Sequence, residues 1–506
     1  MKYVNKQFLL IVMSICIAFT SCKKGYLDVN KDPNRVTEDN VTPELIFTQA
    51  AVSVGDRVVG GSANSQGAKL PLQFAQSWVG YMAANGDFAR DPTETSYNID
   101  FGFGNTLFVN TYNTLFDLHQ AEVKGLAAGD SAVTGASIIL SAKLFQEMVD
   151  LFGNLPYTAA FHVDETTRPT YDKAQDIYAS LQKRLDTAIM YFQVPVSSAF
   201  ETADVINHGD AGLWIKFANT LKLRLLIRQS EIVGFDPSAE ITKIENGGGV
   251  LEAGESISVN PGYVDDVDKQ SPFYANYGYT PTGVVATTSE NANEYIIGIL
   301  TSTTDARIER FFDPVGTSFV GCAYGDDPGN IAPGNQASYF GPGLVASATQ
   351  DQWIYPSFES LFLKAEAIAR GWIAGDANLA LSEAITESFV WLGVPDAEAE
   401  AAAYIANNPD IADLTSAGAS ALAQAKFIAF QKYIANTGVD AVESYADIRR
   451  LNFLSDDSYI SLNPARVSDA LPVRLLYPQS EYTSNSENVL KEGSINAFTS
   501  KLFWQP

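Results

Sequence analysis

Apolar residues recur with helical spacing in four blocks of the chain. In residues 170–192 they fall at positions i, i+3, i+4, i+7 and i+11, which is the spacing of one face of an α-helix. Three further blocks, 210–230, 357–372 and 425–438, repeat this spacing and combine alanine with large aromatic residues. The pattern predicts helical hairpins of the tetratricopeptide type. Periodicity alone leaves an irregular helical bundle open as the alternative.

Capping residues mark the expected starts of two of these helices. Asp172, with Gln175 three residues later, is predicted to cap the first helix, and Asp210 is predicted to cap the second. Gly438 is expected to end the last helix. Three large aromatic residues on the apolar stripes are expected in the core, namely Trp214, Phe358 and Trp372.

The helical blocks are separated by segments of different composition. Residues 246–352 are rich in glycine, proline, tyrosine, asparagine and serine. A structureless loop of this length is uncommon in a compact domain unless it carries a function. We therefore expect an insertion that folds over the helices and exposes Tyr274, Tyr277, Tyr279 and Tyr324. A shorter loop block covers residues 78–105.

The N-terminus has the features of an export signal. Lys2 and Lys6 precede an apolar run at 8–19, which is the length of a signal-peptide core and too short for a membrane-spanning helix. Small residues then lead to Cys22, an arrangement that resembles a bacterial lipobox. Cys22 is therefore predicted to carry lipid, which would hold the chain on a membrane without a spanning helix. An ordinary signal peptide with an incidental cysteine is the alternative.

The amino-acid composition limits the kinds of molecule that the protein is expected to bind. The chain has 59 acidic and 33 basic residues, a formal net charge of −26, and such a field repels the phosphate backbone of nucleic acids. Of 3 cysteines, Cys16 would leave with the signal and Cys22 would carry lipid, so Cys322 has no partner for a disulfide. Few charged residues and 23 tyrosines indicate an aromatic-rich polar surface that suits neutral polar ligands.

Catalytic motifs are missing from the sequence. A zinc site or a serine triad would have to use one of the 3 histidines, His119, His162 and His208. There is no His-Glu-x-x-His helix, no Gly-x-Ser-x-Gly elbow and no phosphate-binding loop. A pair of carboxylates at glycosidase spacing cannot be judged from sequence, because its distance depends on the fold.

Two acidic clusters are weak candidates for structural calcium. Asp265, Asp266 and Asp268 form one cluster, and Asp326 with Asp327 forms the other. Neither has the spacing and glycine of a calcium-binding EF-hand loop, so solvated acidic loops are favoured and no cofactor is expected.

Aromatic residues in the loop blocks are the stronger candidates for ligand binding. The flat C–H face of a sugar packs on an aromatic ring, while its hydroxyls need polar partners around that ring. The candidates in the first block are Trp78, Tyr81, Asn85, Phe101, Phe103 and Asn105. Those in the second block are Tyr274, Tyr277, Tyr279 and Tyr324.

Several motifs together resemble one family. Besides the lipobox, they are LDVNKDPN at 27–34, DLFGNLPYTAAF at 150–161, WIKFANTLKLRLLIR at 214–228, RIERFFDPVGTSFVGCAYG at 307–325, ESLFLKAEAIARGW at 359–372 and LPVRLLYPQSEY at 471–482. In this order they resemble the SusD-like lipoproteins of Bacteroidota, in a divergent branch, along the whole chain.

The resemblance implies an all-α fold, a right-handed superhelix of tetratricopeptide-like helix pairs with a large loop-rich insertion. It also implies a non-enzymatic lipoprotein of the outer membrane, facing the exterior, that captures a glycan or similar nutrient as the lid of a SusC-like TonB-dependent transporter. The alternatives are a surface glycoside hydrolase or peptidase, and a structural subunit without a ligand. The expected parts are a signal peptide (1–21), a lipidated tether (22–42) and one domain (43–506) with helical repeats (43–235), the insertion (236–352) and returning helices (353–506).

Overall fold

The computed structural model describes residues 41–57, 72–89, 91–162, 164–454 and 457–506. The chain divides into two units, Met1–Thr42 and Pro43–Pro506, and the fold described below is that of the second unit. The predicted signal peptide, Cys22 and all but the last two residues of the predicted tether lie outside the described residues.

Long helices form the first part of the second unit. They are α2 (Pro43–Asp56), α5 (Asn105–Ala128), α6 (Ser131–Phe152), α7 (Ala174–Tyr191) and α9 (Ala211–Arg228). Each packs against the next in this order. Only Gly129 and Asp130 separate α5 from α6: Gly129 ends α5 with a φ of +74°, and Asp130 caps α6 by accepting a hydrogen bond from the Val133 amide. This turn makes α5 and α6 a tight helical hairpin.

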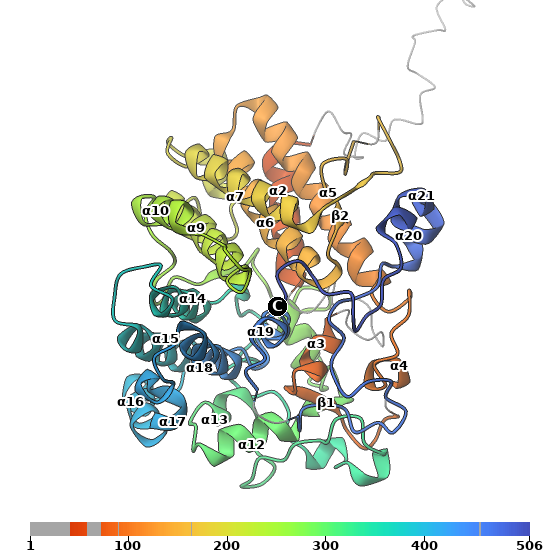
Figure 1. Ribbon diagram of the computed structural model, residues 1–506, viewed down its shortest axis with the longest axis vertical. Helices are drawn as coiled ribbons and strands as arrows, with labels where there is room; N and C mark the ends of the chain where they lie inside the picture. Colours follow the sequence, from red (N-terminus) through yellow and green to blue (C-terminus); the bar gives the residue numbers. More distant parts are fainter. Residues whose placement is uncertain (1–40, 58–71, 90, 163, 455–456) are drawn as a thin grey trace, which may run out of the picture. The chain divides into compact units, whose positions relative to one another are not determined.

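A second group of long helices returns near the end of the chain. It consists of α14 (Ser357–Ala369), α15 (Ala377–Trp391), α16 (Ala397–Asn407), α18 (Ala421–Ala435) and α19 (Ala441–Leu451). Figure 1 shows α5 to α9 in orange to yellow-green, α14 to α18 in teal to blue, and α19 near the middle of the view. The expected all-α class with tetratricopeptide-like helix pairs is confirmed.

Short elements fill the intervening segments. The helices are α3 (Gln73–Trp78), α4 (Pro92–Thr95), α8 (Ser198–Ala203), α10 (Ser238–Asn246), α11 (Pro272–Tyr277), α12 (Glu294–Ser302), α13 (Ile308–Phe311), α17 (Pro409–Ala412), α20 (Gln479–Ser484) and α21 (Ser486–Val489). The strands are β1 (Met82–Ala84), β2 (Leu155–Pro156), β3 (Tyr171–Asp172), β4 (Ile257–Val259), β5 (Glu290–Ala292) and β6 (Gln352–Tyr355). Described strands pair antiparallel as β1–β5, β2–β3 and β4–β6.

The predicted caps had different outcomes. Asp210 caps α9, since its carboxylate accepts a hydrogen bond from the Leu213 amide, as expected. The prediction for Asp172 is wrong, because this residue belongs to β3 and its carboxylate accepts hydrogen bonds from the amides of Tyr157 and Thr158. Because Asp172 is part of the strand that pairs with β2, it is not the N-cap of the helix, and α7 begins two residues later. The predicted core residues Trp214 and Phe358 are fully buried, whereas Trp372 lies beyond α14 and is half-buried.

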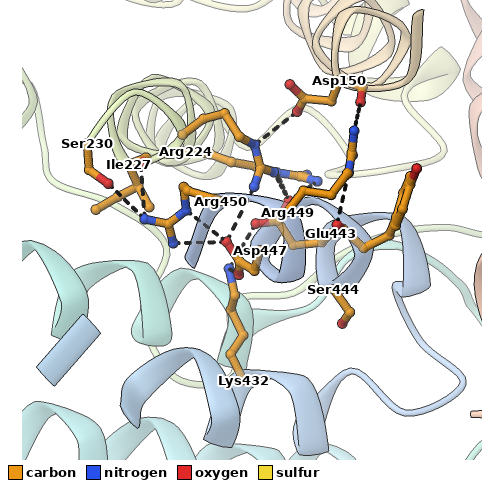
Figure 2. Close-up of polar contacts among 12 residues, drawn as sticks. Asp150, Arg224, Ile227, Ser230, Lys432, Glu443, Ser444, Asp447, Arg449 and Arg450 are labelled. Atoms are coloured by element: carbon orange, nitrogen blue, oxygen red, sulfur yellow. Dashed lines mark hydrogen bonds and ion pairs between the residues drawn. The ribbon is translucent and has the colours of Figure 1, made fainter. Parts of the chain in front are cut away.

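A network of buried charges joins the two groups of helices (Figure 2). Its members, called the ion network below, are Asp150 of α6, Arg224 and Arg228 of α9, Glu366 of α14, Lys432 of α18, and Glu443, Asp447 and Arg450 of α19. Arg228 contacts the carboxylates of Asp150, Glu443 and Asp447, the first at 3.1 Å and the last at 3.4 Å. Arg450 lies 2.6 Å from Glu366. Helix α19 is thus bound by ion pairs to α9, α14 and α18, and through Arg228 of α9 it is linked to Asp150 of α6.

Candidate functional site

The two loop blocks are joined by a short antiparallel pair of strands. Strand β1 in the first block pairs with β5 in the second, with Met82 opposite Ala292 and Ala84 opposite Glu290. Just beyond the end of β1, the backbone amide of Asn85 donates a hydrogen bond to the Ser289 carbonyl over 3.1 Å. Segments about two hundred residues apart in sequence thus meet at one place.

Asn85 fixes the loop that follows β1. Its buried side-chain amide donates to the carbonyl oxygen of Thr288 and to the side-chain oxygen of Asn291, both over 2.7 Å. Its own side-chain oxygen accepts a hydrogen bond from the Asp87 amide over 3.0 Å. All of these bonds lie within the protein, so Asn85 positions the loop.

Gly86 allows a close approach between this loop and residues 328–332. Its amide donates to the Ala332 carbonyl over 2.9 Å. A Cβ atom at Gly86 would lie 2.3 Å from the Ile331 carbonyl oxygen, closer than real Cβ contacts allow. Only glycine therefore fits where the two loops meet.

A small hollow of about 10 Å³, open to solvent, lies at this junction. We call it the surface hollow; its lining residues are Ala84, Asn85, Phe88, Asp91, Glu94, Thr95, Tyr324, Gly325, Pro328 and Ile331. The Phe88 ring is 41% exposed, while Tyr324 is buried and donates its hydroxyl to the Glu94 carbonyl over 3.3 Å. Burial, and then the nearby Glu94 charge, raises the pKa of Tyr324 well above its ordinary value. Tyr324 is therefore a neutral structural group.

The carboxylates around the surface hollow accept hydrogen bonds from the backbone. Asp91 caps α4 by accepting from the amides of Thr93 and Glu94 over 2.9 and 3.2 Å. Asp87 accepts from the Gly334 amide over 2.8 Å. These bonds shape the loops and leave an apolar ring beside polar backbone and side-chain groups, which is the composition of a small-ligand site.

Two of the sequence-predicted ligand residues, Trp78 and Tyr81, lie in the interior, and a third, Phe103, is half-buried against Trp78. Trp78 is fully buried and stacks on Phe103 with ring centroids 5.6 Å apart and planes at 5°. Tyr81 is also fully buried, and its hydroxyl contacts Ser444 over 2.7 Å. These rings bind the first loop block to the helices, and none of the three lines the surface hollow.

The remaining candidates are divided among several places. Asn85 and Tyr324 line the surface hollow. Phe101, 43% exposed, packs on Tyr482 with centroids 4.7 Å apart, and Asn105 accepts a hydrogen bond from the Ser480 amide, so both contact α20.

The structure agrees with the predicted exposure of the insertion's tyrosines only in part. Tyr279 is 46% exposed and Tyr274 is half-buried. The predicted exposure of Tyr277 and Tyr324 is wrong: the ring of Tyr277 packs on Phe273 and Phe340, each 4.9 Å away, and the Tyr324 hydroxyl bonds to the first loop block. The insertion is also more ordered than expected, since it contains α10 to α13 and strands β4 and β5.

Phe88 is the exposed aromatic residue of the lining, and sequence reasoning did not single it out. It follows Asn85, Gly86 and Asp87, a run of turn-forming residues that places an apolar residue at an exposed loop tip. That signal was available in the sequence.

No cluster of three or more potential metal-ligating residues occurs in the described part of the chain. Asp266 pairs with Lys269 over 2.8 Å, and Asp326 accepts a hydrogen bond from Asn330. That both acidic clusters are solvated loops without bound calcium stays a prediction. Among the described helices, none is both long and apolar enough to cross a membrane.

Comparison with known proteins identifies the family. A SusD-like family model, described as starch-binding and associating with the outer membrane, matches residues 33–478. Because the match covers most of the chain, the chain belongs to the SusD-like family. Members of this outer-membrane family bind carbohydrates and are not enzymes, in agreement with the expected class. No curated protein matches the chain.

Solved structures agree with this assignment. A chitin-binding SusD homologue from Flavobacterium johnsoniae has a TM-score of 0.74 at 21% identity, over 90% of this chain and 98% of its own. A SusD-like protein from Bacteroides thetaiotaomicron has a TM-score of 0.71 at 22% identity, over 91% and 98%. A SusD homologue from Bacteroides fragilis has a TM-score of 0.71 at 19% identity, over 92% and 99%. Likeness at these identities shows the shared fold.

Proposed function

We propose that the protein captures an oligosaccharide at the cell surface and delivers it to a SusC-like TonB-dependent transporter, for which it serves as the lid. The surface hollow supports this proposal most directly. It joins both loop blocks and leaves the Phe88 ring exposed beside hydrogen-bonding groups. A sugar can stack on such a ring while its hydroxyls bond to the surrounding polar atoms.

The ligand we propose is a neutral glycan. The family description names starch, and one structural neighbour binds chitin, so maltoheptaose and chitohexaose are suitable probes. Binding by contact and stacking should change little between low and high salt, whereas a charge-driven encounter would be screened. Isothermal titration of the full chain in mild detergent at two salt concentrations tests this; failure of both sugars to bind would contradict the proposal.

Anchoring through Cys22 and pairing with a transporter complete the proposed role. A lid needs an interface at least comparable to the standard size of about 1,600 Å². We expect mild detergent extracts to yield the protein together with a large β-barrel, and recovery only as a monomer would count against the lid. Cys22→Ala should abolish labelling by radioactive palmitate, and persistent labelling would rule out this anchor.

A further inference from the structure

A pair of aromatic rings lies on the surface where the first loop block meets α20. Phe101 is 43% exposed, and its ring packs on the half-buried ring of Tyr482 with centroids 4.7 Å apart and planes at 56°. Neither residue lines the surface hollow. An aromatic ring that packs on a protein neighbour and is also open to solvent offers a flat apolar face to a ligand.

The loop that carries Phe101 is held in a fixed shape. The Asp100 carboxylate accepts hydrogen bonds from the backbone amides of Gly102 and Phe103 over 2.8 and 3.1 Å. The Phe101 carbonyl accepts a hydrogen bond from the Gln479 amide over 2.8 Å, which ties the loop to the start of α20. Because the exposed ring is already in position, a ligand that stacks on it would not have to pay for ordering the loop.

Asn105 brings a polar side chain to the same end of α20. Its side-chain oxygen accepts a hydrogen bond from the Ser480 amide over 3.2 Å, which orients the side chain. Among the described residues, none accepts a hydrogen bond from the Asn105 side-chain nitrogen, and none bonds to the Tyr482 hydroxyl. Burial, opposed by Arg474, raises the pKa of Tyr482, so its hydroxyl stays protonated and can donate. Both side chains can therefore give a hydrogen bond to a ligand.

The carboxylates nearest in sequence to these groups are already engaged. Asp100 accepts the two backbone hydrogen bonds given above, and Glu481 accepts from the Tyr171 hydroxyl over 2.6 Å and from the Asn485 side-chain nitrogen over 3.1 Å. The groups left for a ligand are ring faces, an amide and a hydroxyl, all of them uncharged. This set matches a neutral sugar, whose C–H face stacks on a ring while its hydroxyls bond to polar groups beside that ring.

We infer that Phe101, Asn105 and Tyr482 form a second carbohydrate-binding site, called the α20 platform, for a sugar unit of a neutral oligosaccharide. The inference rests on the proposed function, because both sites take the same class of ligand. It gives a role to Phe101 and Asn105, which the sequence singled out but which do not line the surface hollow.

The first test places a reporter on the α20 platform. Phe101→Trp keeps a stacking ring and adds an indole whose fluorescence responds to contact with a ligand. Maltoheptaose or chitohexaose should shift its emission to the blue, relative to the wild type titrated in the same way. Phe116→Trp, which replaces a ring of 39% exposure on α5, is the matched control and should show no shift. The absence of a shift in Phe101→Trp with both sugars would overturn the inference.

The same reporter separates the two sites. The shift should persist when Phe101→Trp is combined with Phe88→Ala, and its loss there would place both residues in one site and overturn a separate platform. Binding that depends on Phe88 without a shift at position 101 would leave the proposed function standing and overturn this inference alone. If isothermal titration finds that neither sugar binds the wild type, both fail.

The second test measures affinity in the Phe88→Ala background. Adding Phe101→Ala should weaken the remaining binding by about tenfold, as expected for loss of an aromatic contact. Adding Asn105→Asp, which keeps an oxygen for the Ser480 amide but removes the amide donor, should weaken it by about threefold. The Tm should stay unchanged in both, because neither change removes a buried side chain. Retained affinity after Phe101→Ala would overturn the inference.

Discussion

The ion network and the surface hollow use carboxylates in opposite ways. In the ion network, Glu443 and Asp447 are fully buried and paired with arginine and lysine from other helices. At the hollow, Asp87 and Asp91 accept backbone hydrogen bonds in loops. Pairing of buried charges fixes how the helices pack, whereas carboxylates bonded to backbone amides shape the loops around the surface hollow. Disruption of the first should therefore affect stability, and disruption of the second should affect binding.

The largest expected effect comes from breaking the ion network. Glu443→Gln leaves Arg224, Arg228 and Lys432 without their shared carboxylate. Removing one partner of a buried ion pair typically costs about 3–5 kcal/mol in the free energy of unfolding. Urea unfolding should detect this loss, and Lys491→Met, which breaks an exposed pair with Glu487, should leave the unfolding midpoint unchanged. An unaltered midpoint in Glu443→Gln would show that the ion network does not hold the helices.

Trp78→Ala separates the interior of the first loop block from its exposed tip. Because Trp78 is fully buried against Phe103 and Tyr97, its truncation should cost about 3 kcal/mol of unfolding free energy. Phe88→Ala in the same block should leave the thermal unfolding curve unchanged. If Trp78→Ala has wild-type stability and loses only ligand affinity, Trp78 is a contact residue after all.

Two glutamates of α14 should respond to pH in opposite directions. Burial raises the pKa of Glu359 to about 7, although Arg224 opposes this; for Glu366, burial is outweighed by Arg450 and Arg370, which hold the pKa at about 2. The folded state therefore keeps the Glu359 proton that the unfolded state releases near pH 4.5, so this group's contribution to stability falls between about pH 4.5 and 7. Glu366 stabilises above about pH 4.5, and its contribution is lost as the pH falls toward 2.

Substitution by glutamine makes this contrast measurable. Glu359→Gln should match the wild type in urea unfolding at pH 5 and exceed it at pH 8, because the amide replaces a carboxyl that resists ionisation. Glu366→Gln should be less stable than the wild type at both values. A Glu359→Gln difference that does not grow with pH would contradict the assignment.

The helical scaffold was predictable from the sequence because burial imposes a regular period. Trp214 and Leu221 lie on the stripe that α9 buries, and Asp210 caps the helix as its position indicates. Membership of the SusD-like family was also predictable from the sequence, because the motifs that resemble the family occur in the family's order along the chain.

The site was predictable only in part, because pairing between distant segments decides which loop residues are exposed. Trp78 and Tyr81 lie next to β1, whose pairing with β5 holds them against the core. Tyr277 points inward because α11 packs Phe273 and Tyr277 against Phe340. Glycine and asparagine near an aromatic residue indicate a loop, but they do not say which face of that loop meets the protein.

The affinity of Phe88→Ala for an oligosaccharide tests the central claim most directly. Phe116→Ala is the matched control, because Phe116 is 39% exposed, close to the 41% of Phe88, and lies on α5 rather than in the surface hollow. Truncating an aromatic contact residue typically costs about 2 kcal/mol of binding free energy, more than tenfold in Kd. Isothermal titration with maltoheptaose and chitohexaose should give this loss for Phe88→Ala alone, with unchanged Tm. Wild-type affinity in Phe88→Ala for whichever sugar binds would contradict a ligand site at the surface hollow.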